Sequence, residues 1–245
     1  MFLTPEKLLI IMKILPLLLI TAIPLPAATI TQWNFNSAVG DNNVATGTTS
    51  PSTGVGTASL LTTTATFASG IANTGSTDPN TTDNSAWGTT AYPAATVGDL
   101  SAGVQFLVDT RGYDNIMLTY DLRHSNSSSR YEAVQYTTNG TSWTTAAFFT
   151  GAAGDTWFNG RSVNLSSISQ VANNQNFGVR IVSAFESTAT GAGPASYAVS
   201  TTGNTYAASG TWRFDMVTVS GSAVPEPTAA LLGSIGLLGL LRRRR

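Results

Sequence analysis

Few side chains in this sequence could take part in catalysis, and the most reactive is its one histidine, His124. Serines follow it at positions 125 and 127–129, and a Ser-His-Asp triad would need such a histidine. However, the chain has no cysteine, and no Gly-x-Ser-x-Gly sequence positions a serine nucleophile. We expect a histidine at a polar strand end to be a surface or hydrogen-bonding residue.

Glycoside hydrolysis would instead need two carboxylates on either side of a sugar-sized cleft. Glu132 and Glu186 are the only glutamates between residues 29 and 223. We expect both to be solvent-exposed charges. The sequence therefore predicts that the protein is not an enzyme, and a secreted hydrolase is the function that the sequence favours least.

Two stretches rich in Asp and Asn, residues 78–84 and the smaller group 41–43, offer oxygen donors for an ion. Calcium binds six to eight oxygens of carboxylates, amides and carbonyls, so it is the ion that these loops favour. Their spacing lacks the closing glutamate of an EF-hand, and Asp and Asn in loops also cap turns. We predict no cofactor and assign no metal ligands.

Four aromatic residues could stack on sugar rings: Trp87, Tyr92, Trp143 and Trp157. Large aromatic side chains are equally expected inside a β-sandwich, and we prefer that interpretation. A row of exposed aromatic residues would favour carbohydrate binding.

The segments that must position these residues have the pattern of short β-strands. Thr, Val, Tyr, Phe and Trp alternate with polar residues, and clusters of Gly, Asn, Asp and Ser separate the runs. Expected strands lie at residues 29–35, 58–67, 103–109, 115–122, 131–137, 142–149, 161–165, 176–185 and 211–219. No window within residues 29–223 shows helical periodicity.

About nine or ten short strands in one domain predict an all-β fold, a two-sheet antiparallel sandwich or jelly roll. The first and last strands should lie close together. Asn139-Gly140 predicts a type I′ hairpin turn between two strands. The long polar stretches 37–57 and 71–98 are predicted to be loops.

The composition of residues 29–223 limits the classes of partner. This stretch has six Arg and no Lys against nine Asp and two Glu, a net charge of −5. Nucleic-acid binding needs a basic surface, so we expect no nucleic-acid partner. Without cysteine, the domain must be stabilised by packing and not by disulfides.

Residues 1–28 have the pattern of a secretory signal peptide. Lys7 and Lys13 precede an apolar core at 14–23, and small residues follow at Ala27 and Ala28. A signal helix is therefore expected at this end, with cleavage after Ala27 or Ala28.

The last residues, 224–245, combine three elements in a fixed order. Pro225, Glu226 and Pro227 come first, an apolar run of 13 residues at 229–241 follows, and Arg242, Arg243, Arg244 and Arg245 end the chain. A helix of this length spans roughly 20 Å, which is short for a bilayer core of about 30 Å. The arginines should stay on the cytoplasmic side as a stop to translocation.

This tail resembles the PEP-CTERM sorting signal, which exosortase-type membrane enzymes of Gram-negative bacteria recognise and process. The segments 112–123 and 134–143 are also similar to parts of many PEP-CTERM ectodomains and of secreted jelly-roll modules. The resemblance implies a signal peptide (1–28), an extracellular β-sandwich domain (29–223) and a sorting signal (224–245) with a short transmembrane helix. No ligand residues are carried over with it.

The interpretation that follows is an exported structural or adhesive protein of the cell surface or extracellular polymer. It would cross the inner membrane, be anchored there transiently by the C-terminal helix, and then reach the cell surface or matrix. Its expected partners are the exosortase-type processing enzyme, the inner membrane during transit and extracellular polysaccharide. A carbohydrate-binding module is the alternative.

Overall fold

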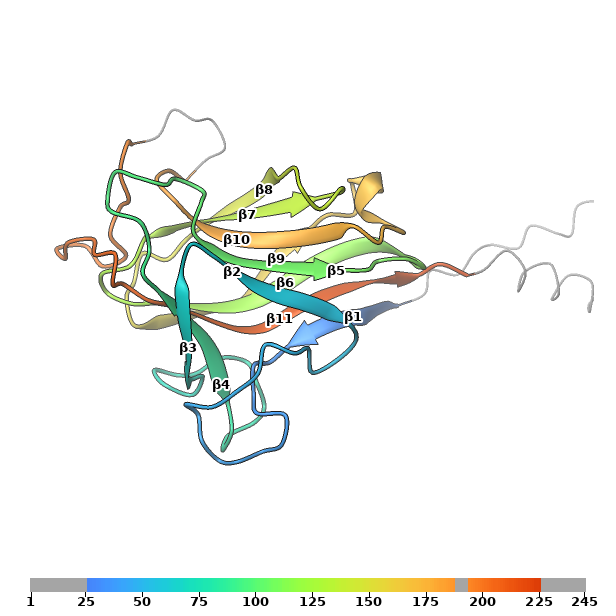
Figure 1. Ribbon diagram of the computed structural model, residues 1–245, viewed down its shortest axis with the longest axis horizontal. Coiled ribbons are helices and arrows are strands. Elements are labelled where there is room, and N and C mark those ends of the chain that lie inside the picture. The colour runs from blue at the N-terminus through green and yellow to red at the C-terminus, as the bar shows by residue number, and fades with distance from the viewer. Residues whose placement is uncertain (1–25, 188–193, 226–245) are drawn as a thin grey trace, which may run out of the picture.

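The computed structural model describes residues 26–187 and 194–225, and these form an all-β domain (Figure 1). The described strands are β1 (Ala27–Trp33), β2 (Gly56–Leu61), β3 (Thr64–Ser69), β4 (Ser85–Thr90), β5 (Gly103–Val108), β6 (Tyr113–His124), β7 (Tyr131–Thr137), β8 (Thr144–Thr150), β9 (Thr156–Asn164), β10 (Phe177–Ala184) and β11 (Trp212–Ala223). The one helical element among them is a 3₁₀ turn, Ser169–Val171. The predicted all-β class is confirmed.

Two antiparallel sheets pack against each other as a sandwich. One sheet has the order β3-β4-β11-β6-β9, with β1 also paired to β11, and the other has the order β2-β5-β10-β7-β8. Their inner faces share one apolar core, in which Trp33 meets Phe106 with ring centroids 4.8 Å apart. Strand alternation explains this core, because every second residue of a strand points to the same face.

A β-bulge changes which residues of β11 face the core. Trp212 and Phe214 point inward before it, whereas Val217 and Val219 point inward after it. The register against β6 shifts between Asp215 and Thr218, and Met216 has a positive φ of 47°. One extra residue reverses the parity of a strand, so the bulge keeps both halves of β11 apolar on the inside.

The first and last strands lie side by side, as predicted (Figure 1). Ala27 pairs with Ser222 and Trp33 with Val217. The chain therefore enters and leaves the domain at the same end of the sandwich.

Three details of the strand prediction are wrong. The expected strand 58–67 is two strands in different sheets, because the chain turns at Thr62, whose φ is 53°. Strand β4 lies inside the expected loop 71–98, where five of its six residues are buried and show no alternation. Asn139-Gly140 is not a type I′ turn: Gly140 has a positive φ but Asn139 does not, and its side chain caps a longer loop by accepting from Ser142 N at 2.8 Å. The antiparallel pairing of β7 with β8 is nevertheless present.

The predicted signal helix and C-terminal transmembrane helix lie almost entirely in residues 1–25 and 226–245, outside the described residues. Within the described part of the chain, no helix is long and apolar enough to cross a membrane.

Candidate functional site

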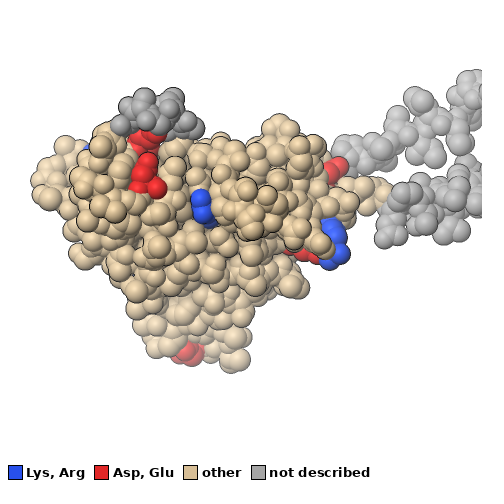
Figure 2. Space-filling model, turned by 45° about the horizontal axis from the view of Figure 1, so that its top comes forward, with Lys and Arg blue, Asp and Glu red and all other residues tan. Residues whose placement is uncertain are grey.

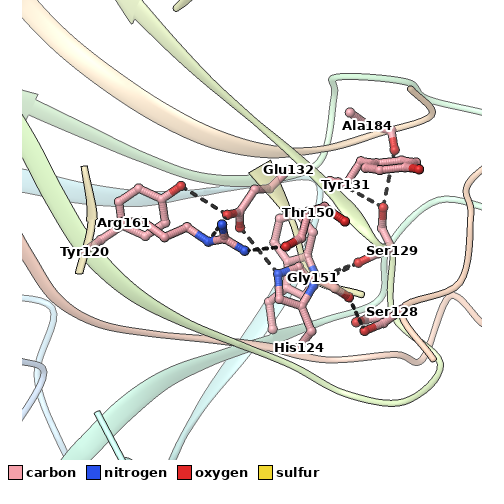
Figure 3. Close-up of polar contacts among 12 residues, drawn as sticks. Tyr120, His124, Ser128, Ser129, Tyr131, Glu132, Thr150, Gly151, Arg161 and Ala184 are labelled. Atoms are coloured by element: carbon pink, nitrogen blue, oxygen red, sulfur yellow. Dashed lines mark hydrogen bonds and ion pairs between the residues drawn. The ribbon is translucent and has the colours of Figure 1, made fainter. Parts of the chain in front are cut away.

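The candidate catalytic histidine belongs to a charged network enclosed between the two sheets (Figure 3). We call Tyr120, His124, Glu132 and Arg161 the core network. His124 Nε2 lies 3.5 Å from Glu132 Oε2, and Arg161 forms an ion pair with the same carboxylate. The Tyr120 hydroxyl donates to Glu132 Oε1 at 3.3 Å. Glu132 comes from one sheet and its three partners from the other, so the network joins the two sheets across the core.

Strand geometry explains how these polar groups come to lie inside. Glu132 alternates with Val134 on β7, so both point to the core, and neither is accessible to solvent. Arg161 of β9 pairs with Tyr120 of β6. Its guanidinium carbon lies 4.8 Å and 4.7 Å from the ring centroids of Phe149 and Phe158. Aromatic faces attract a cation that has lost water, so the rings stabilise the buried charge.

The His124 ring is completely buried and has neighbours in contact with it on several sides. Its Nδ1 lies 2.9 Å from Ser129 O, and because a carbonyl only accepts, this nitrogen carries the hydrogen. Phe158 and Trp212 pack against the ring, and a Cβ built on Gly151 would lie 2.5 Å from it. No serine hydroxyl of the described residues bonds to His124. The geometry holds a packed imidazole, without a nucleophile beside it.

Burial also affects the tyrosine of the core network. Loss of water, with a further contribution from the negative charge of Glu132, raises the pKa of Tyr120 well above its usual value. Tyr120 therefore remains a neutral hydroxyl that donates to the carboxylate.

The expectation for Glu132 is wrong. Glu132 is not a solvent-exposed charge: it is completely buried, because it shares the inner face of β7 with Val134 and has Arg161 as its counter-charge. His124 was expected to be a surface or hydrogen-bonding residue, and it is hydrogen-bonded and buried. Glu186 is half-buried, two residues beyond the end of β10. Since Glu132 is closed off from solvent, the two glutamates do not flank an open cleft.

The four aromatic candidates do not form a platform. Trp87, Tyr92 and Trp157 are buried, with 4%, 6% and 6% of their surface exposed. Trp87 stacks on Phe35, and Tyr92 packs against Trp212. Only Trp143 of the four is partly open to solvent. The core interpretation is confirmed for Trp87 and Tyr92, whereas Trp157 is buried outside the core, where its Nε1 donates to Ala72 O at 2.8 Å.

Trp143 instead marks a row of polar side chains on the outer face of the five-stranded sheet. We call Ser59, Gln105, Arg180, Gln135 and Thr145 the polar row, because they are direct cross-strand neighbours from β2 to β8. Val104 and Phe106 point to the core, so Gln105 between them points outward together with its neighbours.

The middle of the polar row is held in place by its own contacts. Arg180 Nε donates to Gln135 Oε1 at 2.6 Å, and Gln135 Nε2 donates to Thr145 Oγ1 at 3.1 Å. The Arg180 guanidinium carbon lies 4.6 Å from the ring centroid of Trp143. Partial burial lowers the pKa of Arg180 from its usual value, but arginine keeps its charge at neutral pH. Arg180 thus presents its terminal N–H groups from a fixed position beside an aromatic ring.

Sequence reasoning did not find the polar row, since its members are scattered over five strands. Only Trp143 had been singled out. The signal available in the sequence was the polar residue between two apolar ones in each of Val104-Gln105-Phe106 and Val179-Arg180-Ile181.

The two Asp- and Asn-rich loops meet in space, although they are far apart in sequence. Asp83 Oδ2 would lie 3.7 Å from a Cβ built on Gly40, the residue before Asp41. Hydrogen bonds from Thr46 and Asn43 lower the pKa of Asp41, whereas burial and then the neighbouring Asp41 raise the pKa of Asp83. Other members cap turns: Asp78 Oδ1 accepts from Asn80 N at 2.8 Å, and Asn80 Oδ1 accepts from Asp83 N at 3.0 Å.

A second pair of aspartates fastens the 71–84 loop to the outer face of the six-stranded sheet. Asp121 and Asp215 are cross-strand neighbours and both are buried. Asp121 Oδ2 accepts from Thr77 N at 2.6 Å, and Asp215 Oδ2 accepts from Ser76 Oγ at 2.6 Å. Burial raises the pKa of Asp215 well above its usual value. Across residues 26–187 and 194–225, no three His, Asp or Glu side chains are grouped so that they could hold a metal ion.

Charged side chains are sparse on the face of the molecule drawn in Figure 2. Of the predicted sorting residues, Pro225 lies directly after Val224, whose N–H donates to Gly112 O at 2.8 Å. Glu226, Pro227 and Arg242–Arg245 lie outside the described residues.

No family model matches this chain, and no curated protein matches it.

Proposed function

We propose that this chain is an exported structural or adhesive protein of the cell surface or extracellular polymer, sorted by its C-terminal signal. The observation that carries this proposal is the pairing of β1 with β11, which brings residues 27 and 222 together. The predicted signal peptide and the predicted sorting signal therefore adjoin the same end of the sandwich.

The end of β11 also suits recognition of the tail. Pairing with β1 and β6 continues to Ala223, and Val224 is fixed by Gly112. Only two residues separate Ala223 from Glu226. Proline fixes its own φ and restricts the residue before it, so the sequence Pro225-Glu226-Pro227 favours an extended backbone at Glu226. A processing enzyme would thus meet Glu226 close to a rigid domain.

The sorting proposal is tested by replacing Glu226 with alanine in a Gram-negative host that has an exosortase-type enzyme. We expect Glu226→Ala to remain unprocessed in the inner membrane, because the enzyme loses the one charge between the domain and the apolar run. Asp109→Ala, at an exposed carboxylate of the domain, is the matched control and should be processed normally. A Glu226→Ala protein that reaches the surface with the mass of the processed parent would contradict the proposal.

The polar row favours a second function, binding of extracellular polysaccharide. Buried Gln135 fixes the position of the Arg180 guanidinium, whose remaining N–H groups can donate to a ligand, and Trp143 adds an aromatic face beside it. Such a surface would bind a neutral sugar chain that lies across the strands.

Polysaccharide binding is tested on a glycan array with the parent protein and two variants. Trp143→Ala and Arg180→Ala should each weaken binding at least tenfold, since each removes a central group of the polar row. Arg111→Ala removes an arginine whose side chain is 63% exposed and lies outside the polar row. Equal binding by all the proteins would exclude this surface.

A further inference from the structure

We infer that Asp41 and Asp83 form a binding site for one calcium ion, which ties the loop after β1 to the loop before β4. The inference is independent of sorting and of sugar binding, so its failure would leave both proposals unchanged.

The first support is the state of the Asp83 carboxylate. Only 3% of the Asp83 surface is exposed, and its Oδ1 has no hydrogen-bond partner among the described residues. The carboxylate lies against the other loop, because a Cβ built on Gly40 would be 3.7 Å from Asp83 Oδ2. A buried carboxylate oxygen without a partner costs free energy, and a bound cation removes that cost.

The second support is the lack of positive charge to balance the pair. The ion pairs found in the described residues use Asp109, Asp155 and Glu132, and neither Asp41 nor Asp83 takes part in one. Two carboxylates that lie close together repel each other unless a proton or a cation lies between them. Asp41 is exposed, so an ion can enter from its side.

The surrounding atoms are the hard oxygen donors that calcium prefers. Thr46 Oγ1 donates to Asp41 Oδ2 at 2.7 Å and lies 3.1 Å from Ser37 Oγ. Thr46 Oγ1 also reaches Asn43 O at 2.7 Å, which places a backbone carbonyl beside the pair. Two carboxylates supply only some of the six to eight oxygens that calcium binds. Loop carbonyls, hydroxyls and water would complete the ligands, as in calcium sites of modest affinity.

The two loops are already attached to each other, so the site is largely formed before an ion binds. Asn36 Nδ2 donates to Asp78 Oδ2 at 2.8 Å, Ser85 N donates to Asn36 Oδ1 at 2.8 Å, and Ser85 Oγ donates to Thr46 O at 2.6 Å. Because the two loops are already held together, calcium binding would cost less conformational entropy.

The test is thermal unfolding of the full chain in detergent, with EDTA, with 10 mM CaCl2, with 10 mM MgCl2 and with NaCl of equal ionic strength. Extracellular calcium modules bind with Kd on the order of 0.1–1 mM, so calcium should raise Tm by about 3–10 °C. Magnesium should raise Tm less, because it demands a smaller, octahedral site. Asp83→Asn and Asp41→Asn should each abolish most of the calcium shift, whereas Asp109→Asn should keep it.

Asp83→Asn has a second expected signature. In EDTA it should be at least as stable as the parent, because the amide removes the repulsion between the two carboxylates and keeps their shape. A parent protein with no calcium shift, or an Asp83→Asn variant with the full shift, would overturn the inference. If Asp83→Asn does not fold, Asp41→Asn at the exposed position decides the question by the same two readouts.

Discussion

Replacing Glu132 by glutamine should lower the stability of the domain severely, although the two side chains have nearly the same shape. The change leaves the Arg161 guanidinium, whose side chain is 10% exposed, without its counter-charge. Removing one partner of a buried ion pair costs about 3–5 kcal/mol. Arg161 would keep its bond to Thr150 O at 2.8 Å and its two aromatic neighbours, so we expect the lower end, about 3 kcal/mol.

The measurement is thermal and urea unfolding of the full chain in detergent, followed by tryptophan fluorescence. For a domain of this size, a loss of about 3 kcal/mol lowers Tm by about 6–12 °C. Asp109→Asn breaks an ion pair whose side chains are 63% and 41% exposed, and it should cost less than about 1 kcal/mol. A double variant, Glu132→Met with Arg161→Met, should recover most of the loss, because two apolar side chains can replace a buried pair. If Glu132→Gln costs no more than Asp109→Asn, the core network does not stabilise the packing of the two sheets.

Three further predictions follow from single positions. Gly103→Ala would place its Cβ against the Ile181 carbonyl oxygen and should lower the free energy of unfolding in urea by about 3 kcal/mol or more. Gly112→Ala, at φ 80° with open space around it, should lower it by about 1–2 kcal/mol. Equal losses would contradict the predicted clash at Gly103. Burial raises the pKa of Tyr197 to about 12 and that of Tyr120 well above 10. The neutral hydroxyls therefore stabilise the fold fully below pH 10, and this contribution is lost as pH rises through the folded-state pKa values. A free energy of unfolding that stays constant from pH 9 to 11.5 would contradict this prediction. The raised pKa of Asp215 means that its protonated form stabilises the fold below about pH 4 and that this contribution is lost at higher pH. The Asp215→Asn variant should therefore gain stability relative to the parent between pH 4 and 7. Parallel pH profiles of the two proteins would contradict this prediction.

The sequence predicted the fold well where strands have one buried and one exposed face. Strand β6 alternates Ile116, Leu118, Tyr120 and Leu122 toward the core, and this pattern was visible without the structure. Strand β4 was missed for the opposite reason. Ser85 to Thr89 are buried on both faces, because β4 lies between β3 and β11 and beneath loops, so it has no alternation to detect.

The candidate sites depended more on long-range pairing, which a sequence pattern does not contain. Glu132 occurs in alternation with Val134, and that pattern does indicate the core face of β7. Its counter-charge Arg161 becomes apparent only when β9 is known to pair with β6. Likewise, the sequence places Asp41 and Asp83 in two separate loops, and only the fold brings those loops together.

The distribution of positive charge gives the domain its chemical character. Each of its six arginines has a partner. Arg161 lies in the core beside Glu132, Arg123 pairs with Asp155 and Arg111 pairs with Asp109. Arg130 donates to Val199 O, Arg213 donates to Ser69 O, and Arg180 is stacked on Trp143. Such a surface cannot attract an anionic polymer by long-range charge. A polymer that the domain binds must therefore be recognised by hydrogen bonds and ring contact, and within the described residues the polar row is the surface that offers both together. By the same reasoning, the unbalanced carboxylates of Asp41 and Asp83 favour a small cation that diffuses to them, since the domain has no lysine of its own to supply the charge.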